Sequence, residues 1–239
     1  IGGIEQVGLY DAGFMIINTY VGLIFTAMST DYFPRLSAVS ESNNQCRQTI
    51  NYQAEIAILI LAPILIIFLI FIKEIIVILY SNQFVSIDKM IYWAAIGMFF
   101  KTATWAIGYI LLAKSNSKVF FISELVTNIY TLAFNILGYY YYGLEGLGIS
   151  FLISYVLSLI QVFLIAKIKY DFSFNNPFLK IFIIQFTMAI LSFLLIYFVE
   201  NSYLYFFGII LICLSSLFSY KELDYRIDFV QLFNKGNEK

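Results

Sequence analysis

The sequence has no histidine, only two cysteines and three prolines, and few charged residues: 12% of its 239 residues. A soluble globular domain has about 25% charged residues. Hydrophobic residues make up 61% of this chain, aromatic residues 19%, and the mean hydropathy is +0.85. A water-soluble protein of this size has no room to bury so many apolar side chains. The composition therefore argues against a soluble enzyme, a nucleic-acid-binding protein and a disordered segment.

The missing residue types also limit the chemistry. With no histidine and two isolated cysteines, Cys46 and Cys213, the chain lacks the usual zinc ligand sets and a disulfide framework. It contains neither a nucleophile elbow nor a pair of carboxylates in a soluble cleft. We therefore expect a protein that is not an enzyme and binds no metal or cofactor. The net charge of −1 suggests no electrostatic partner, and no nucleic acid.

Long apolar runs dominate what remains. A helix that crosses about 30 Å of hydrocarbon needs about 20 mostly apolar residues. Seven stretches qualify: residues 10–30, 54–72, 90–113, 119–138, 146–166, 178–198 and 203–220. They lack the alternation of polar and apolar residues that is typical of membrane β-barrels. The sequence therefore predicts an all-α, polytopic transmembrane bundle of seven spanning helices.

The positive charges alternate between the joints of these helices. Eleven of the fourteen lysines and arginines lie in every second joint or in the tail. The opposite joints hold only Lys73 and Lys89, and the remaining cation, Lys101, lies inside a span. By the positive-inside rule, the N-terminal end of this chain is outside and its C-terminus is cytoplasmic. Because the chain opens at Ile1 without a methionine, we expect it to be the C-terminal part of a longer polypeptide.

Four of the predicted spans have a polar face. Polar residues in a bilayer usually face the bundle interior or a water-filled path. The faces are Asp11, Asn18, Gly22 and Ser29 in the first span; Lys101, Thr104, Trp105 and Gly108 in the third; Glu124, Asn128, Thr131 and Asn135 in the fourth; and Ser150, Ser154, Ser158 and Gln161 in the fifth. In the fourth span the spacings of 4, 3 and 4 residues put all members on one side of a helix. The second, sixth and seventh spans are more uniformly apolar, and we expect them to be peripheral.

Lys101 is the most informative of these residues. It lies 11 residues from the nearer end of its span, about 16 Å into the membrane. A charge at that depth costs roughly 2.5–3.5 kcal/mol. One interpretation is a cationic site in an aqueous cavity for an anionic or sugar-rich substrate. The other is a buried ion pair with Glu124 that only joins two helices; Asn128 and Asn135 extend the polar face beyond what one pair needs and favour the first.

Two further candidates have alternative interpretations. Asp11 is either a coupling or gating carboxylate or a solvated helix end. Trp105 either stacks on a sugar ring or packs between helices. The predicted transport-cavity and substrate residues are Lys101, Glu124, Asn128, Asn135, Trp105, Asp11 and Asn18.

Several short strings resemble a known family. Residues 7–13 (VGLYDAG) and 31–37 (DYFPRLS) resemble the "VGxYxAA … PxLS" stretch of polysaccharide flippases in the multidrug/oligosaccharidyl-lipid/polysaccharide (MOP) exporter superfamily. Residues 108–114 (GYILLAK), together with Phe100, Lys101, Trp105 and Glu124, resemble its O-antigen translocase branch. Residues 142–149 (YGLEGLGI) are similar to the family's "yGlxGxGxa" entry to the following helix. The similarity extends over roughly residues 7–166.

The resemblance implies a flippase that moves undecaprenyl-pyrophosphate-linked oligosaccharide, such as an O-antigen repeat unit, across a bacterial inner membrane by alternating access. Its partners would be this substrate, membrane lipids, the missing N-terminal lobe of the same polypeptide, a polysaccharide polymerase and glycosyltransferases. Within the family, cationic cavity residues meet the pyrophosphate or acidic sugars, and Lys101 is the candidate here. The resemblance implies five helices of an incomplete second lobe in residues 1–166, and two accessory helices with a cytoplasmic tail in 167–239.

Two other functions are weighed against this one. A multidrug or cation antiporter of the same fold would favour an acidic cavity, and a central lysine argues against it. A membrane polysaccharide polymerase or ligase usually needs a large, arginine-rich external loop. The outer joints here are short and hold two lysines, so this function ranks last.

Overall fold

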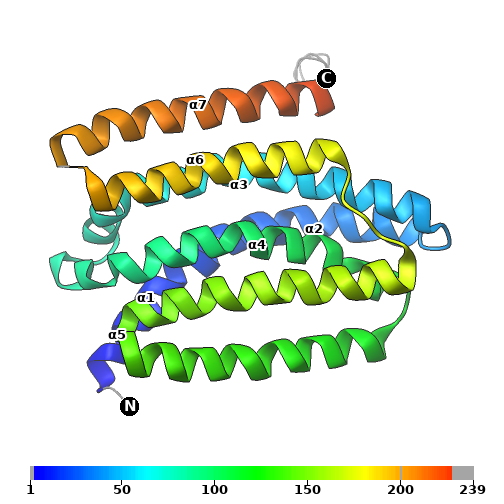
Figure 1. Cartoon of the computed structure of the whole chain (residues 1–239), viewed down its shortest axis with the longest axis horizontal. Coiled ribbons are helices and arrows are strands. Elements are labelled where there is room, and N and C mark those ends of the chain that lie inside the picture. Colours follow the sequence, from blue (N-terminus) through cyan, green and yellow to red (C-terminus); the bar gives the residue numbers. More distant parts are fainter. Residues whose placement is uncertain (1–2, 200, 228–239) are drawn as a thin grey trace, which may run out of the picture.

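The computed structural model describes residues 3–199 and 201–227 of the chain, and within them every regular element is a helix. The elements are α1 (Ile4–Met15), the π-helix η1 (Ile16–Tyr20), α2 (Val21–Ala38), α3 (Asn43–Leu79), the 3-10 helix η2 (Asn82–Ile87), α4 (Asp88–Ala113), α5 (Ser117–Tyr170), α6 (Asn176–Phe198) and α7 (Asn201–Ile227). The long helices run nearly parallel or antiparallel to one another (Figure 1). The predicted all-α fold class is confirmed.

Six helices in the described part of the chain are long and apolar enough to cross a membrane. α5 has 54 residues and would be roughly 80 Å long if straight, far more than one crossing needs. It is broken at Gly143, where φ is 59° and ψ is −137°, and folds back on itself (Figure 1). Its two antiparallel arms, residues 117–142 and 144–170, correspond to the predicted fourth and fifth spans. The chain is a multi-pass membrane protein.

Small and polar residues join the two arms of α5. The Ser150 hydroxyl donates to the carbonyl of Phe134 at 2.6 Å, and Gln161 Nε2 donates to Ser123 Oγ at 2.8 Å. Near the fold-back, a Cβ added to Gly146 would lie 1.9 Å from the carbonyl oxygen of Gly138. The backbones approach so closely because these positions have small side chains.

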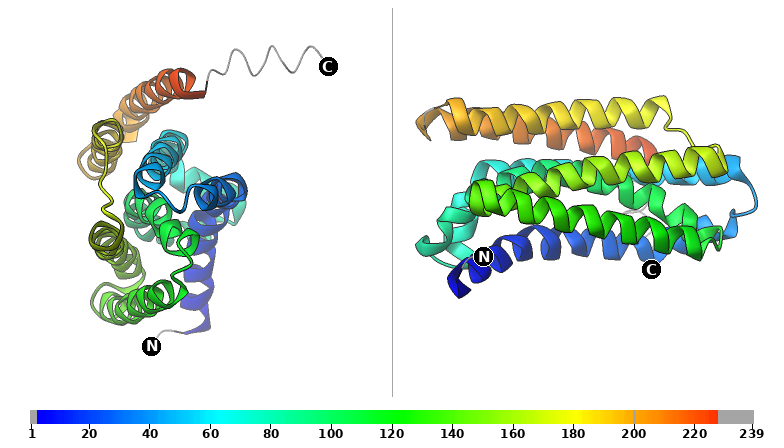
Figure 2. Two further views of the ribbon diagram at one scale, coloured as in Figure 1. Left: turned by 90° about the vertical axis from the view of Figure 1, so that its right-hand side faces the viewer. Right: turned by 60° about the horizontal axis from the view of Figure 1, so that its bottom comes forward.

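α3 lies at the centre of the bundle and packs against α2, α4, α6 and α7. The prediction that the second span is peripheral is therefore wrong. A uniformly apolar helix suits an interior surrounded by other helices as well as it suits lipid, so periodicity does not separate the two cases. α6 and α7 are far less buried and lie at one edge of the bundle, as predicted (Figure 2).

The residues between the first two predicted spans, 31–53, are mostly helical. α2 extends to Ala38 and α3 begins at Asn43, so only residues 39–42 connect them. Ser42 caps α3, with the Gln45 N–H donating to Ser42 Oγ at 3.4 Å. Polarity marks where a helix leaves the membrane, and the helix itself can continue into water.

The connections at residues 39–42, 114–116 and 171–175 gather at one end of the bundle, together with the end of α7 (Figure 1). Lys73 and Lys89 flank the opposite end, around η2. Lys235 and Lys239, two of the eleven cations assigned to the cytoplasmic side, lie outside the described residues. The other nine lie toward the first end, so the charge asymmetry expected from the sequence is present along the bundle axis.

The α6–α7 hairpin is joined by buried polar contacts. Gln185 Nε2 on α6 donates to Ser219 Oγ on α7 at 2.8 Å, and Ser215 Oγ donates to Gln185 Oε1 at 2.6 Å. Glu74 on α3 accepts a hydrogen bond from Tyr205 on α7. These contacts fix α7 to its neighbours over most of its length.

Candidate functional site

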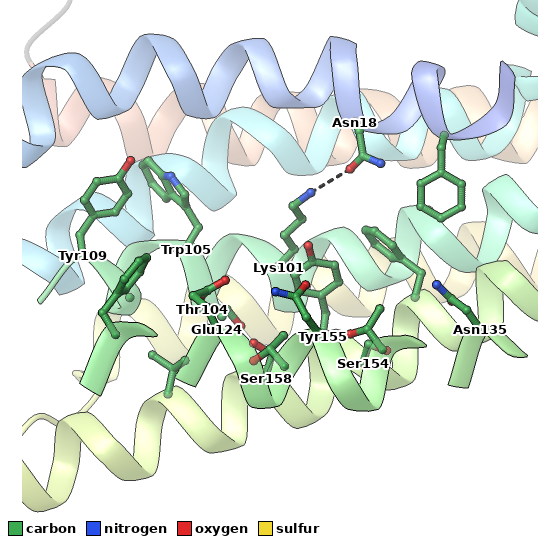
Figure 3. A pocket seen from close by; sticks show the side chains of 18 of the residues that line it. Asn18, Lys101, Thr104, Trp105, Tyr109, Glu124, Asn135, Ser154, Tyr155 and Ser158 are labelled. Carbon is green, nitrogen blue, oxygen red and sulfur yellow. Dashed lines mark hydrogen bonds between the residues drawn. The ribbon is translucent and has the colours of Figure 1, made fainter. Parts of the chain in front are cut away.

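A cavity of about 530 Å³ lies between the first helix (the continuous helical run Ile4–Ala38, which comprises α1, η1 and α2), α4 and the two arms of α5 (Figure 3). Its wall contains six of the seven predicted site residues: Asn18, Lys101, Trp105, Glu124, Asn128 and Asn135. Along α5 the wall extends from Phe120 to Asn135, about 22 Å at 1.5 Å per residue. The cavity therefore runs through much of the membrane's depth.

Lys101 projects into this cavity toward the first helix (Figure 3). Its Nζ donates to Oδ1 of Asn18 at 2.8 Å. The same Nζ lies 5.6 Å from the ring centre of Phe151 and 5.2 Å from that of Tyr155. Within residues 3–199 and 201–227, no carboxylate pairs with it. The Lys101 charge is thus held by a neutral amide and two aromatic faces.

These contacts explain how an ammonium group persists in the membrane without a counter-ion. Insertion of a lysine at mid-depth costs roughly 2.5–3.5 kcal/mol. A hydrogen bond from a charged donor contributes about 1.5–3 kcal/mol, and a partly desolvated cation–π contact contributes about 0.5–2 kcal/mol. The sum is comparable to the cost, and none of these contacts cancels the positive charge.

Glu124 does not take the role of counter-ion to Lys101. It lies seven residues into α5, whereas Lys101 lies twelve residues before the end of α4, which offsets them by roughly 8 Å along the bundle. Glu124 is on the side of the cavity near Thr104 and Ser158, and the Lys101 ammonium points away from it (Figure 3). The interpretation of a helix-pinning ion pair is wrong, because the lysine side chain is directed to the first helix.

Amide, hydroxyl and carboxyl side chains line the wall opposite Lys101. Glu124, Asn128, Thr131 and Asn135 all line the cavity from the first arm of α5, as their spacing predicts. Ser154 and Ser158 line it from the second arm. Ser154 is 2% exposed, and its Oγ has no hydrogen-bond partner within the described part of the chain. A buried hydroxyl without a partner costs about 1–3 kcal/mol, so this wall has unused hydrogen-bonding capacity.

Trp105 belongs to an aromatic cluster between the first helix and α4. Its ring centre lies 5.1 Å from that of Phe25, 5.5 Å from that of Tyr32 and 5.6 Å from that of Tyr109. Tyr32 is fully buried and donates to the carbonyl of Ala106 at 2.6 Å. Trp105 therefore packs between helices, as one of its two interpretations predicts. It also lines the cavity, where the stacking on a sugar ring that the other interpretation predicts would take place.

Asp11, the remaining candidate, is exposed and does not line the cavity. The first helix contributes Tyr10, Phe14 and Asn18 instead. The polar face predicted for the first span holds only for one regular α-helix. In the structure, η1 interrupts it with i→i+5 turns. The wider turn changes which residues share a face, so Asn18 points into the cavity whereas Asp11 does not.

The sequence interpretation missed the aromatic lining. Tyr10, Phe14, Phe151 and Tyr155 all line the cavity, and two of them contact the ammonium of Lys101. Phe151 and Tyr155 each follow a serine of the predicted polar face, Ser150 and Ser154. The available signal in the sequence was the spacing of four residues between these two aromatic residues, which puts both on the same side of the helix. No group of three or more histidine, cysteine or acidic residues within the described ranges can hold a metal ion.

Comparison with known proteins supports this architecture. Residues 2–89 match a family model described as a polysaccharide biosynthesis protein. No curated protein matches the chain significantly. The fold is similar to that of the lipid II flippase MurJ in an inward closed conformation, with a TM-score of 0.70 and 16% identity over 93% of this chain. This chain covers 48% of that one, about half its length.

The two matches confirm the resemblance to polysaccharide flippases that the sequence strings indicated. The solved protein with the similar fold is a flippase. The fold shared with this solved structure agrees with the predicted all-α, polytopic transmembrane bundle.

Proposed function

We propose that this chain forms the second lobe of a flippase that moves lipid-linked oligosaccharide across a bacterial inner membrane by alternating access. Residues 1–166 supply the lobe and its cavity, and residues 167–239 supply two accessory helices and a cytoplasmic tail. An N-terminal lobe completes the path. The N-terminal end of this chain faces outward and its C-terminus lies in the cytoplasm, as the distribution of lysine and arginine suggests.

The observation that supports this function best is that Lys101 has no counter-ion among the described residues and lies in a long cavity lined by both polar and aromatic side chains. Among the described residues its ammonium donates to a neutral amide and to no carboxylate, so an anionic group of the substrate gains its full attraction. An undecaprenyl pyrophosphate headgroup or an acidic sugar supplies such a group. A cationic drug would meet repulsion at the same place, which disfavours the multidrug or cation antiporter.

The opposite wall suits a sugar chain. Asn128, Asn135 and Ser154 offer donors and acceptors along the cavity, and the Glu124 carboxylate can accept from sugar hydroxyls. Tyr10 and Trp105 add aromatic surface at which sugar rings can stack. The oligosaccharide, an O-antigen or another surface polysaccharide repeat unit, would pass along this wall.

An apolar groove suits the lipid part of the substrate. It has a volume of about 330 Å³ and lies between α6 and α7, lined by Leu191, Leu194, Leu195, Phe198, Val199, Phe207, Ile210 and Leu211. The polyprenyl tail would remain in lipid along these two helices while the headgroup crosses. Polysaccharide polymerase and glycosyltransferases are the expected partners in the cell.

The test is the Lys101→Gln variant of the full-length protein in cells that lack the wild-type copy. Surface polysaccharide should be lost while the amount of protein in the membrane stays normal, and Glu124→Ala should also reduce it strongly. Lys118→Gln, at the exposed end of α5, is the matched control and should produce normal polysaccharide. Normal polysaccharide with Lys101→Gln would contradict the assignment of the cavity.

A further inference from the structure

We infer that Asn18 is a positioning residue: it holds the Lys101 ammonium in the cavity with a neutral acceptor, so that the charge stays available to an anionic ligand. This inference rests on the proposed function and adds to it a residue on a different helix. Asn18 lies on the first helix and Lys101 on α4, 83 residues apart in the chain. Figure 3 shows the two side chains meeting across the cavity.

The hydrogen bond fixes the orientation of the Asn18 amide. A lysine ammonium has three donors and no acceptor, so the amide must present its oxygen, Oδ1, to it. The two N–H donors of Nδ2 then face elsewhere, and within the described ranges they have no partner. Asn18 therefore leaves the positive charge of Lys101 intact. It also adds two N–H donors to the wall that the first helix contributes to the cavity.

An aspartate at this position would have nearly the same shape and the opposite effect. A carboxylate oxygen 2.8 Å from Nζ would form an ion pair in a partly desolvated site, where attraction between charges is strong. Lys101 would then be neutralised from within the protein. An amide retains the position of the ammonium without this neutralisation.

The local backbone places Asn18 where it can do this. Asn18 is the central residue of η1 (Ile16–Tyr20), the single π-helical turn in the described part of the chain. Ile16 and Ile17 on that turn are buried at 0% and 1% exposure, so the turn is fixed by packing rather than free to slide. Single π-helical turns inside α-helices often occur at functional sites. Here the turn gives the first helix an inward-facing amide at the level of Lys101.

A second lysine–asparagine contact provides a matched control. Lys114 Nζ donates to Oδ1 of Asn43 at 2.7 Å, and this contact is exposed at the end of the bundle. The chemical change from asparagine to aspartate is the same in both places. Only the change at Asn18 alters the charge inside the cavity.

The experiment measures binding of farnesyl pyrophosphate, a short polyprenyl pyrophosphate, to the purified full-length protein in nanodiscs. Asn18→Asp should weaken binding about tenfold or more, with a thermal unfolding midpoint equal to or above that of the wild type. Asn18→Leu, which removes the acceptor without adding charge, should weaken binding about threefold. Asn43→Asp should bind like the wild type.

The Lys101→Gln background separates the possible results. If Asn18 acts through Lys101, Asn18→Leu, which adds no charge, should leave binding in that background unchanged. An equal loss of about threefold from Asn18→Leu in both backgrounds would overturn the inference, as would wild-type binding by Asn18→Asp when Lys101→Gln loses binding. Wild-type binding by Lys101→Gln itself would instead contradict the charge assignment of the proposed function.

Discussion

Arg226 on α7 and Glu55 on α3 form a buried ion pair, with Nε and Oε2 2.8 Å apart and only 10% and 6% of the side chains exposed. The other carboxylate oxygen of Glu55 accepts from Asn175 Nδ2 at 2.9 Å. Tyr52 donates to the carbonyl of Arg226 at 3.2 Å. The end of α7 is therefore fixed both to α3 and to the connection that precedes α6.

Arg226→Ala should lower the free energy of unfolding by about 3–5 kcal/mol, because it leaves the Glu55 carboxylate buried and unpaired. Unfolding of the full-length protein in mixed detergent micelles measures this change. Lys73→Ala, which removes the partly exposed partner of Asp88 at 3.8 Å, should cost about 0–1 kcal/mol. Equal losses for the two variants would mean that the buried pair does not fix α7.

Gly148→Ala should disturb the contact between α4 and the second arm of α5. A Cβ at Gly148 would lie 2.2 Å from the carbonyl oxygen of Met90, a backbone atom that cannot rotate away. We expect a loss of about 1–3 kcal/mol in the free energy of unfolding, the usual cost of overpacking. Gly8→Ala is the control, because nothing lies within 4 Å of a Cβ there, and it should be neutral or slightly stabilising.

Gly143→Ala tests the fold-back of α5. The residue has φ of 59° and ψ of −137°, a conformation that residues with a Cβ rarely adopt, and the substitution should cost of order 1–3 kcal/mol. Open space surrounds the position, so a loss of stability would come from backbone strain alone. Gly108→Ala, in helical backbone with equal space, should keep wild-type stability; the same result for Gly143→Ala would contradict the strained turn.

Lys101→Gln and Glu124→Gln should have additive effects on the free energy of unfolding. The two side chains do not pair, and changes at sites without a shared partner usually add within about 0.3–0.5 kcal/mol. A double-mutant cycle measured by unfolding in detergent tests this. A coupling energy of about 2 kcal/mol or more would show that an ion pair forms after all.

The fold class and most of the cavity could be predicted from the sequence because both depend on helical spacing. The stripe Glu124, Asn128, Thr131 and Asn135 lies on a regular stretch of α5 and faces the cavity as expected. Depth along the membrane was also predictable for Lys101, since it depends on counting residues. These features need only the rise and pitch of an α-helix.

The features that spacing did not predict depend on long-range packing or on irregular backbone. Residues 16–20 form a π-turn whose sequence, IINTY, has no turn signal, and so Asp11 was placed on the wrong face. The central position of α3 follows from its neighbours, which apolar composition does not specify. Lys101 contacts Asn18, far away in the chain, whereas the sequence suggested Glu124 on the adjacent helix.

The π-turn also bears on sequence alignment and on evolution of this segment. One wide turn within a continuous helix is equivalent to a single inserted residue. Because the wide turn takes up the extra residue, deleting one residue from 16–20 would restore a plain α-helix and keep Tyr10 and Phe14 on nearly the same face relative to α2. The span would still be long and apolar enough to insert, and the rearrangement would be confined to the turn that carries Asn18. A relative with one residue fewer here can thus keep its membrane topology and its aromatic lining without the inward-facing amide.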